Sequence, residues 1–190
     1  MAIPPPLQGE SRWTELDADG KRMRLLEVSR EVFARDGLEA PMPALAAAAG
    51  IGVGSLYRQF PSKRDLLAAL VVERLEEAKR DADLALASRV GPWSALTALL
   101  WDYAERQAGD DVLAEAMACM QVDPEVIAAR AESNAALQRL LDAAKAEGRI
   151  RADATTLDLR LVFAAARAAE KVEPDAWRRM LELGIASLAK

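Results

Sequence analysis

Residues 43–63 read PALAAAAGIGVGSLYRQFPSK and predict two short helices joined by a tight turn. Pro43 suits the first turn of a helix, where its missing N–H would have no partner. Gly50 suits the left-handed backbone conformation that ends a helix abruptly. The second helix is expected over residues 53–60, because Pro61 cannot continue it. This arrangement is typical of a helix–turn–helix.

The second helix has one apolar side and one polar side. Leu56 and Phe60 lie four residues apart, so they share the inner face. The outer side chains offer hydroxyl, amide and guanidinium groups beside small residues, which suits a DNA major groove. The predicted DNA contacts on this helix are Gly52, Val53, Gly54, Ser55, Tyr57, Arg58 and Gln59. The alternative is an ordinary helical corner with a solvated polar face.

The flanking sequence strengthens the DNA-binding interpretation. The motifs are VFARDG at 32–37, LA at 45–46, AGIG at 49–52, GSLYRQFPSK at 54–63 and LL at 66–67. In this combination the chain resembles the tetracycline-repressor (TetR) family of bacterial transcription regulators. It is most similar to members that read GVGxGTLYRHFP at the turn and second helix. Met42-Pro43 departs from the family, in which many members carry a polar residue at the start of the first helix.

The resemblance implies a function and a mode of assembly. It implies that Lys63 binds the DNA backbone. It also implies that the chain forms a homodimer on a palindromic, double-stranded DNA operator. A second similarity, GRIRAD at 148–153 followed by LDL at 157–159, matches the segment before the dimer helices of many members. We therefore expect a ligand-responsive transcriptional regulator, a repressor released by a small apolar ligand.

Composition predicts an all-α fold. Half of the 190 residues are hydrophobic and only 5% are aromatic, and alanine and leucine dominate. The net charge of −5 argues against nonspecific coating of nucleic acid. Residues 19–66 nevertheless carry eight positive and six negative side chains, the sign that DNA requires. We expect an N-terminal arm over 1–18, a three-helix helix–turn–helix DNA-binding head over 19–66, and a helical ligand-binding and dimerisation domain over 67–190.

Several classes of function are disfavoured by residue usage. The chain has one cysteine, Cys119, and no histidine, so no intrachain disulfide, zinc cluster or histidine-based catalysis is predicted. Glu115 and Asp102 could serve only as buried carboxylates, and a solvated helix face is the simpler explanation; we therefore expect no enzyme and no cofactor. Without a leader or a long apolar run, the chain is expected in the cytoplasm, away from membranes.

Two basic segments of the head are candidates for phosphate contacts. Lys21, Arg22 and Arg24 crowd the start of a helix expected over about 20–36, against its dipole, so they either approach DNA or form a solvated cluster. Ser62 is expected to cap the next long helix with Asp65 as its partner. That helix should run to about residue 89 and act as a lever.

Trp13 in the arm either packs loosely on the head or contacts DNA.

The remaining helices are expected over about 92–108, 112–120, 124–147, 154–170 and from 174 to the end. Aromatic and sulfur side chains there are candidates for a ligand pocket, with core packing as the alternative for each. These are Trp93, Trp101, Tyr103, Met117, Cys119, Met120 and Phe163. Cys119 could also sense oxidants, although a lone cysteine is usually a small apolar residue.

The last helix carries a wide apolar stripe that could be buried within one chain or across a two-fold axis. Its members are Trp177, Met180, Leu181, Gly184, Ile185 and Leu188. The alternative to a DNA-binding regulator is a helical dimer that binds a protein partner without specific DNA recognition.

Overall fold

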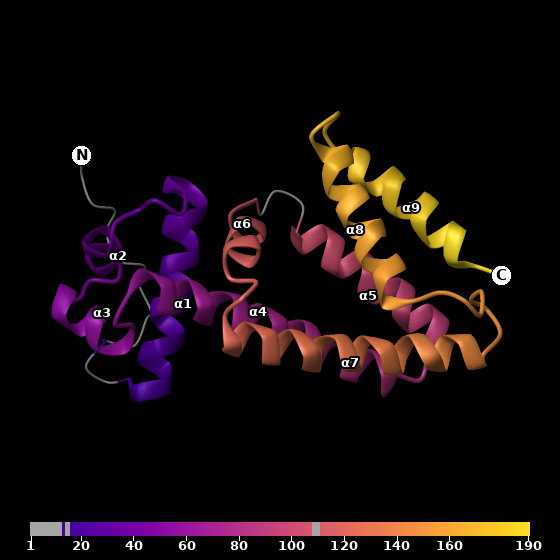
Figure 1. The fold of residues 1–190 in the computed structure, drawn as a ribbon, viewed down its shortest axis with the longest axis horizontal. Helices are drawn as coiled ribbons and strands as arrows, with labels where there is room; N and C mark the ends of the chain where they lie inside the picture. The colour runs from indigo at the N-terminus through magenta and orange to yellow at the C-terminus, as the bar shows by residue number, and fades with distance from the viewer. Residues whose placement is uncertain (1–12, 14–15, 108–110) are drawn as a thin grey trace. The chain divides into compact units, whose positions relative to one another are not determined.

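The computed structural model describes residues 13, 16–107 and 111–190. These residues form nine helices and no strand, which confirms the all-α prediction (Figure 1). Most of the arm expected over 1–18 lies outside the described residues. The helices are α1 (Ala18–Asp36), α2 (Met42–Ala48), α3 (Val53–Gln59), α4 (Lys63–Leu86), α5 (Pro92–Gln107), α6 (Asp111–Cys119), α7 (Pro124–Ala146), α8 (Thr156–Glu170) and α9 (Ala176–Leu188).

The chain divides into two compact units. The first comprises the residues up to Val71 together with Asp111–Asp123, and the second comprises Val72–Asp110 and Pro124–Lys190. Helix α4 is continuous through the boundary, so its first turns belong to the first unit and the rest to the second. The sequence analysis did not anticipate that α6 joins the first unit, where it packs against α1.

In the first unit, α1 and α2 end at glycines as the sequence predicts, but α1 begins at Ala18, two residues before its predicted start. Gly37 and Gly50 have φ of 79° and 69°, so each takes the left-handed conformation after a helix. The N-cap of α1 is Asp17, whose carboxylate accepts a hydrogen bond from the Gly20 N–H at 2.7 Å. Helix α2 starts after Pro41 without a side-chain cap, in agreement with the departure noted at Met42-Pro43.

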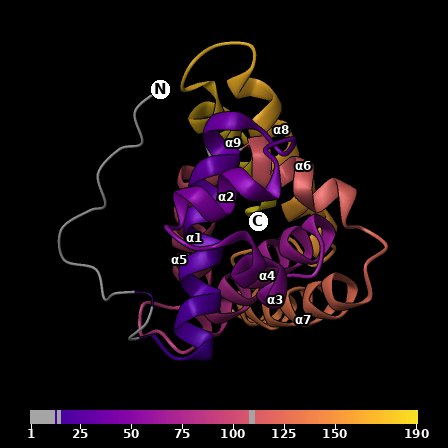
Figure 2. The ribbon, with the colours of Figure 1, turned by 90° about the vertical axis from the view of Figure 1, so that its left-hand side faces the viewer.

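The core of the first unit orients α3. Leu45 of α2, Leu56 of α3 and Phe60 are each no more than 1% exposed, as is Phe33 of α1. Burial of Leu56 and Phe60 fixes the rotation of the short α3, because both lie on one side of it. Figure 2 looks onto the side of the molecule where α1, α2 and α3 are drawn. Because Leu56 and Phe60 face the core, the opposite face of α3 carries the predicted contact residues.

The second unit contains α5 packed on α7, α8 packed on α9, and the remainder of α4. Its core is aliphatic, with Leu100, Leu140, Leu159 and Leu181 at most 1% exposed. In α9 the stripe expected from sequence is largely buried within the chain, since Trp177, Leu181, Gly184 and Leu188 are all buried. Helix α9 begins two residues after Pro174, because Asp175 takes a left-handed conformation with φ of 65°.

Ion pairs join α4 to its neighbours in the second unit. The Lys79 ammonium lies 2.7 Å from the Glu132 carboxylate of α7, and Arg139 of α7 lies 2.6 Å from Asp83. The Glu132 contact raises the pKa of Lys79. Such exposed pairs contribute little to stability, because water and salt screen them. They therefore hold the helix weakly compared with the buried aliphatic core.

Candidate nucleic-acid interface

Helix α3 presents a small, polar outer face. Gly52 and Gly54 are exposed, and a Cβ built on either would meet no atom within 4 Å. Internal packing therefore does not require glycine at these positions. Gly54 is the second residue of the seven-residue α3. Its backbone is open to a close approach from outside the chain, because the space beside it is empty.

The polar side chains of α3 gather beside these glycines. The Arg58 Nη2 donates to the Ser55 Oγ at 2.7 Å, so the guanidinium is held along the helix. Arg58 is exposed, and Tyr57 is 45% exposed, as is suitable for groups that contact a partner. Gln59 and Ser55 are half-buried. This face combines hydrogen-bond donors and acceptors for base edges with small residues that allow a close approach.

The start of α4 is capped as predicted. The Ser62 backbone N–H and hydroxyl donate to the Asp65 carboxylate at 2.9 and 2.8 Å, and the Asp65 N–H donates back to the Ser62 Oγ. This reciprocal pair fixes the N-terminus of the helix, whose dipole favours an anion. Lys63 is the first residue of the helix, and its Nζ lies 5.9 Å from the centre of the Phe33 ring. The ring positions the lysine without neutralising its charge.

The basic residues at the start of α1 each have a contact within the chain. The Arg22 guanidinium lies 4.7 Å from the Phe60 ring centre, and Lys21 Nζ lies 6.0 Å from the Trp13 ring centre. Arg24 forms an ion pair with Glu27 at 2.9 Å. Trp13 thus lies by α1, in line with loose packing on the head. The approach of Lys21, Arg22 and Arg24 to DNA phosphates stays a prediction.

Two family models match the chain. The model for bacterial regulatory proteins of the tetR family matches residues 25–70, which include α2 and α3. The model for the SbtR-like transcriptional regulator C-terminal domain matches residues 91–189, more than half of the chain. The chain belongs to the tetR family of bacterial regulatory proteins.

The chain is also similar to known transcription regulators, in agreement with this family assignment. The chain is similar to the transcriptional repressor KstR of Mycolicibacterium smegmatis, with 31% identity over 98 residues, 51% of this chain and 48% of KstR. It thus spans about half the length of that relative. A crystal structure of a TetR regulatory protein from Mycobacterium vanbaalenii is 30% identical, with a TM-score of 0.66 over 89% of this chain and 95% of that one. A TetR regulator from Streptomyces coelicolor is 27% identical, with a TM-score of 0.67 over 88% and 98%.

The seven pocket candidates of this TetR-family chain fall into two groups. Met117, Cys119 and Met120 lie on α6 or directly after it, in the first unit, whereas the four aromatic candidates lie on α5 and α8 in the second. Met120 is buried but Cys119 is exposed, so the cysteine does not behave as a small buried apolar residue. Whether these residues share a pocket stays a prediction.

Three of the four aromatic candidates of the second unit take part in ring pairs, one of which includes Trp177 of α9. The Tyr103 and Phe163 ring centres lie 4.8 Å apart, and those of Trp101 and Trp177 lie 6.0 Å apart. The Trp93 backbone N–H donates to the Glu147 carboxylate at 2.9 Å. Sequence reasoning placed Trp177 in the α9 stripe but did not anticipate its ring contact with α5.

A charged residue in the second unit also escaped sequence reasoning. Arg74 of α4 is 5% exposed and its guanidinium lies 4.7 Å from the Tyr103 ring centre. The sequence held a signal for this residue, because Arg74 stands between Val71 and Leu75 on the apolar face of α4.

Within the described chain, no helix is both long and apolar enough to cross a membrane. Nor do the described residues include three or more His, Cys, Asp or Glu side chains grouped to hold a metal ion.

Proposed function

We propose that this TetR-family chain is a sequence-specific DNA-binding transcriptional repressor that acts in the bacterial cytoplasm. Residues 19–66 would bind DNA, and residues 67–190 would bind a small effector and form a homodimer. The observation that carries the proposal is the outer face of α3, where exposed glycines that packing does not require stand beside Arg58 and Tyr57. KstR, to which the chain is similar, is named a transcriptional repressor.

The proposed contacts divide into two kinds. Arg58, Gln59, Ser55 and Tyr57 would contact base edges or nearby phosphates, because their groups match the major-groove pattern. The N-terminus of α4 and Lys63 would bind a backbone phosphate, since amide groups and the helix dipole favour an anion there. Gly52, Val53 and Gly54 would allow close approach. The first group would specify sequence and the second would position the protein.

Two protomers would be needed on a palindromic operator. Recognition helices must be spaced about one DNA turn apart, roughly 34–36 Å, to enter successive major grooves. Helices α8 and α9 present leucines that the protein core does not cover, with Leu157 51%, Leu161 58% and Leu183 49% exposed. Exposed apolar clusters of this kind support an interface with a second copy.

Release by an effector would act through α4. This helix is continuous from Lys63, the proposed phosphate contact, to Leu86 in the second unit. An effector bound among the aromatic residues of the second unit would move α4 and change the spacing of the two recognition helices. A displacement of a few ångströms would suffice to weaken binding, because both helices must fit their grooves at once.

The deciding experiment is selection of bound sequences from a random duplex library at moderate salt. Enrichment of a palindromic site with two half-sites would support a dimeric, sequence-reading regulator. Absence of enrichment by a folded dimeric protein would overturn the proposal. That result would favour the alternative, a helical dimer that binds a protein partner without specific DNA recognition. No observation on the described residues supports this alternative.

A further inference from the structure

Arg74 is a buried charge on α4 whose hydrogen bonding is incomplete. Its side chain is 7% exposed, and its Nη1 donates to the Glu77 carboxylate at 3.1 Å. The Nη2 atom is buried and has no hydrogen-bond partner among the described residues. Arginine is rarely buried unless it is fully paired, because removing the charge from water is costly. A buried donor without an acceptor adds to that cost.

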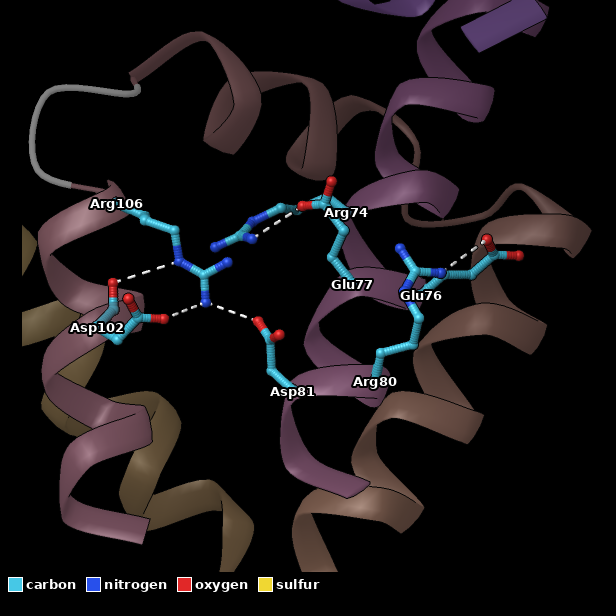
Figure 3. Close-up of polar contacts among 7 residues, drawn as sticks. All are labelled: Arg74, Glu76, Glu77, Arg80, Asp81, Asp102 and Arg106. Carbon is cyan, nitrogen blue, oxygen red and sulfur yellow. Dashed lines mark hydrogen bonds and ion pairs between the residues drawn. The ribbon is translucent and has the colours of Figure 1, made fainter. Parts of the chain in front are cut away.

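The neighbouring carboxylates do not supply the missing acceptor. Figure 3 shows the Arg74 side chain extending from α4 towards α5, on the same side as Arg106. Arg106 binds Asp81 of α4 at 2.6 Å and Asp102 of α5. These contacts raise the pKa of Arg106 despite partial burial, so both carboxylates are engaged by a permanent cation. Among the described residues, Glu77 is the carboxylate that binds Arg74.

The surroundings of Arg74 are otherwise aromatic. Its guanidinium lies 4.7 Å from the Tyr103 ring centre, and the Tyr103 ring in turn contacts Phe163 of α8. Both rings are half-buried and so keep accessible surface. Three helices of the second unit thus converge on one cation and two rings. A guanidinium stacked on a ring presents its N–H groups in a fixed plane, which suits a carboxylate.

We propose that Arg74 binds the anionic end of the effector and that Tyr103 and Phe163 contact its apolar body. The effector is therefore an organic carboxylate rather than a neutral apolar molecule. This inference rests on the proposed function, from which it takes the existence of an effector. A monoanion fits better than a dianion, because Glu77 already neutralises part of the Arg74 charge and Nη2 is the buried donor without an acceptor among the described residues.

The test uses the wild-type chain of 190 residues and simple probes. Benzoate, phenylacetate and hexanoate are titrated at millimolar concentration, each against its neutral amide, and the melting temperature and the dissociation constant are measured. Inorganic phosphate serves as an anion without an apolar body. We expect at least one carboxylate to raise the melting temperature, whereas its amide and phosphate do not. No effect of any carboxylate, or an equal effect of the amides, would overturn the proposal.

Variants locate the site. Arg74→Met keeps an unbranched apolar stem but removes the charged group, and we expect the dissociation constant for the carboxylate to rise about 10-fold or more. The matched control is Arg80→Met on the same helix, which removes an exposed arginine paired with Glu76 at 3.8 Å (Figure 3). It should bind like the wild type. Unchanged binding by Arg74→Met, or an equal loss in Arg80→Met, would overturn the proposal.

The measurements keep this inference separate from the proposed function. Binding is followed without DNA, so a protein that binds an operator but no carboxylate disproves only the inference. A protein that binds a carboxylate through Arg74 but no DNA disproves only the proposed function. If Arg74→Met fails to fold, Tyr103→Leu and the wild-type comparison of acid with amide still decide the outcome. Tyr103→Leu should weaken binding of benzoate, because the ring contact is lost.

Discussion

Gly184 of α9 lies directly against Val162 of α8. A Cβ built on Gly184 would lie 2.8 Å from the Val162 Cγ2, closer than unbonded carbon atoms come, and 3.1 Å from its Cβ, a tight contact. Both residues are buried, and valine is stiff at χ1 and cannot rotate away cheaply. The close approach of α8 and α9 therefore depends on a missing side chain.

Gly184→Ala should destabilise the protein by about 1–2 kcal/mol. Overpacking of a buried contact costs roughly 1–3 kcal/mol, and the gain in helix propensity returns up to about 1 kcal/mol. Urea unfolding would measure the change. Adding Val162→Ala should recover part of the loss, because it removes the atoms that the new methyl group meets. A Gly184→Ala variant as stable as the wild type would show that α8 and α9 separate easily.

Gly54→Ala should have the opposite effect on stability and a separate effect on DNA. The new methyl group meets no atom of the chain within 4 Å, so the free energy of unfolding should rise by about 0.5–1 kcal/mol. Affinity for the operator should fall, because the methyl group would stand between α3 and the groove. Thermal unfolding and operator titration on the same sample check both parts. Unchanged operator affinity would remove Gly54 from the interface.

Arg58→Ala and Lys63→Ala should weaken DNA binding in different ways. Loss of Arg58 should cost roughly 1–3 kcal/mol for the best sequence and relax the preference at its base pair. Loss of Lys63 should weaken all sequences alike and reduce the dependence of log K on log salt by about one. Competition and salt titrations with duplexes of defined sequence distinguish the two. Arg35→Ala, which removes an exposed arginine paired with Asp36, is the control in α1.

Leu161→Glu should convert the proposed dimer into a monomer. Leu161 is 58% exposed on α8, and a charge buried at an interface without a partner is strongly unfavourable. Light scattering during size-exclusion chromatography measures the mass. Leu84→Glu, on an α4 leucine that is 70% exposed, is the control and should leave the mass unchanged. A dimer that survives Leu161→Glu would place the interface elsewhere.

Asp158 should stabilise the start of α8 at neutral pH and lose this effect in acid. The Thr155 hydroxyl and backbone N–H both donate to its carboxylate at 2.7 Å, and these bonds, with Arg151 nearby, lower the pKa of Asp158. As the pH falls below about 4, the unfolded chain takes up the proton first, so stability is lost as the pH passes down through the lowered pKa.

The difference in unfolding free energy between the wild type and Asp158→Ala should therefore be constant near neutral pH and shrink towards pH 3. Urea unfolding at several pH values would measure it. Asp153→Ala removes an exposed carboxylate of the same loop and serves as the control. A difference that stays constant down to pH 3 would contradict the role of the charged carboxylate.

Local signals in the sequence were sufficient for the helices and for the face of α3. Gly37 and Gly50 mark helix ends because few other residues take a left-handed conformation, and Ser62 with Asp65 marks a start through hydrogen bonds three residues apart. Most helix ends differ by only one to three residues from those predicted, because fraying and 3₁₀ turns leave the last turn undefined locally.

The amino-acid sequence by itself determined the nine helices, the helix–turn–helix and the residues it exposes, since these depend on contacts within a few residues. Only the tertiary structure decided the packing of α6 with α1, the contact of Trp177 with Trp101, and the burial of Arg74 against Tyr103. These contacts join residues far apart in the chain; Arg74 and Tyr103 are 29 positions apart, and Trp101 and Trp177 are 76. Many packings satisfy the same helical periodicity, and only the complete set of side chains selects one.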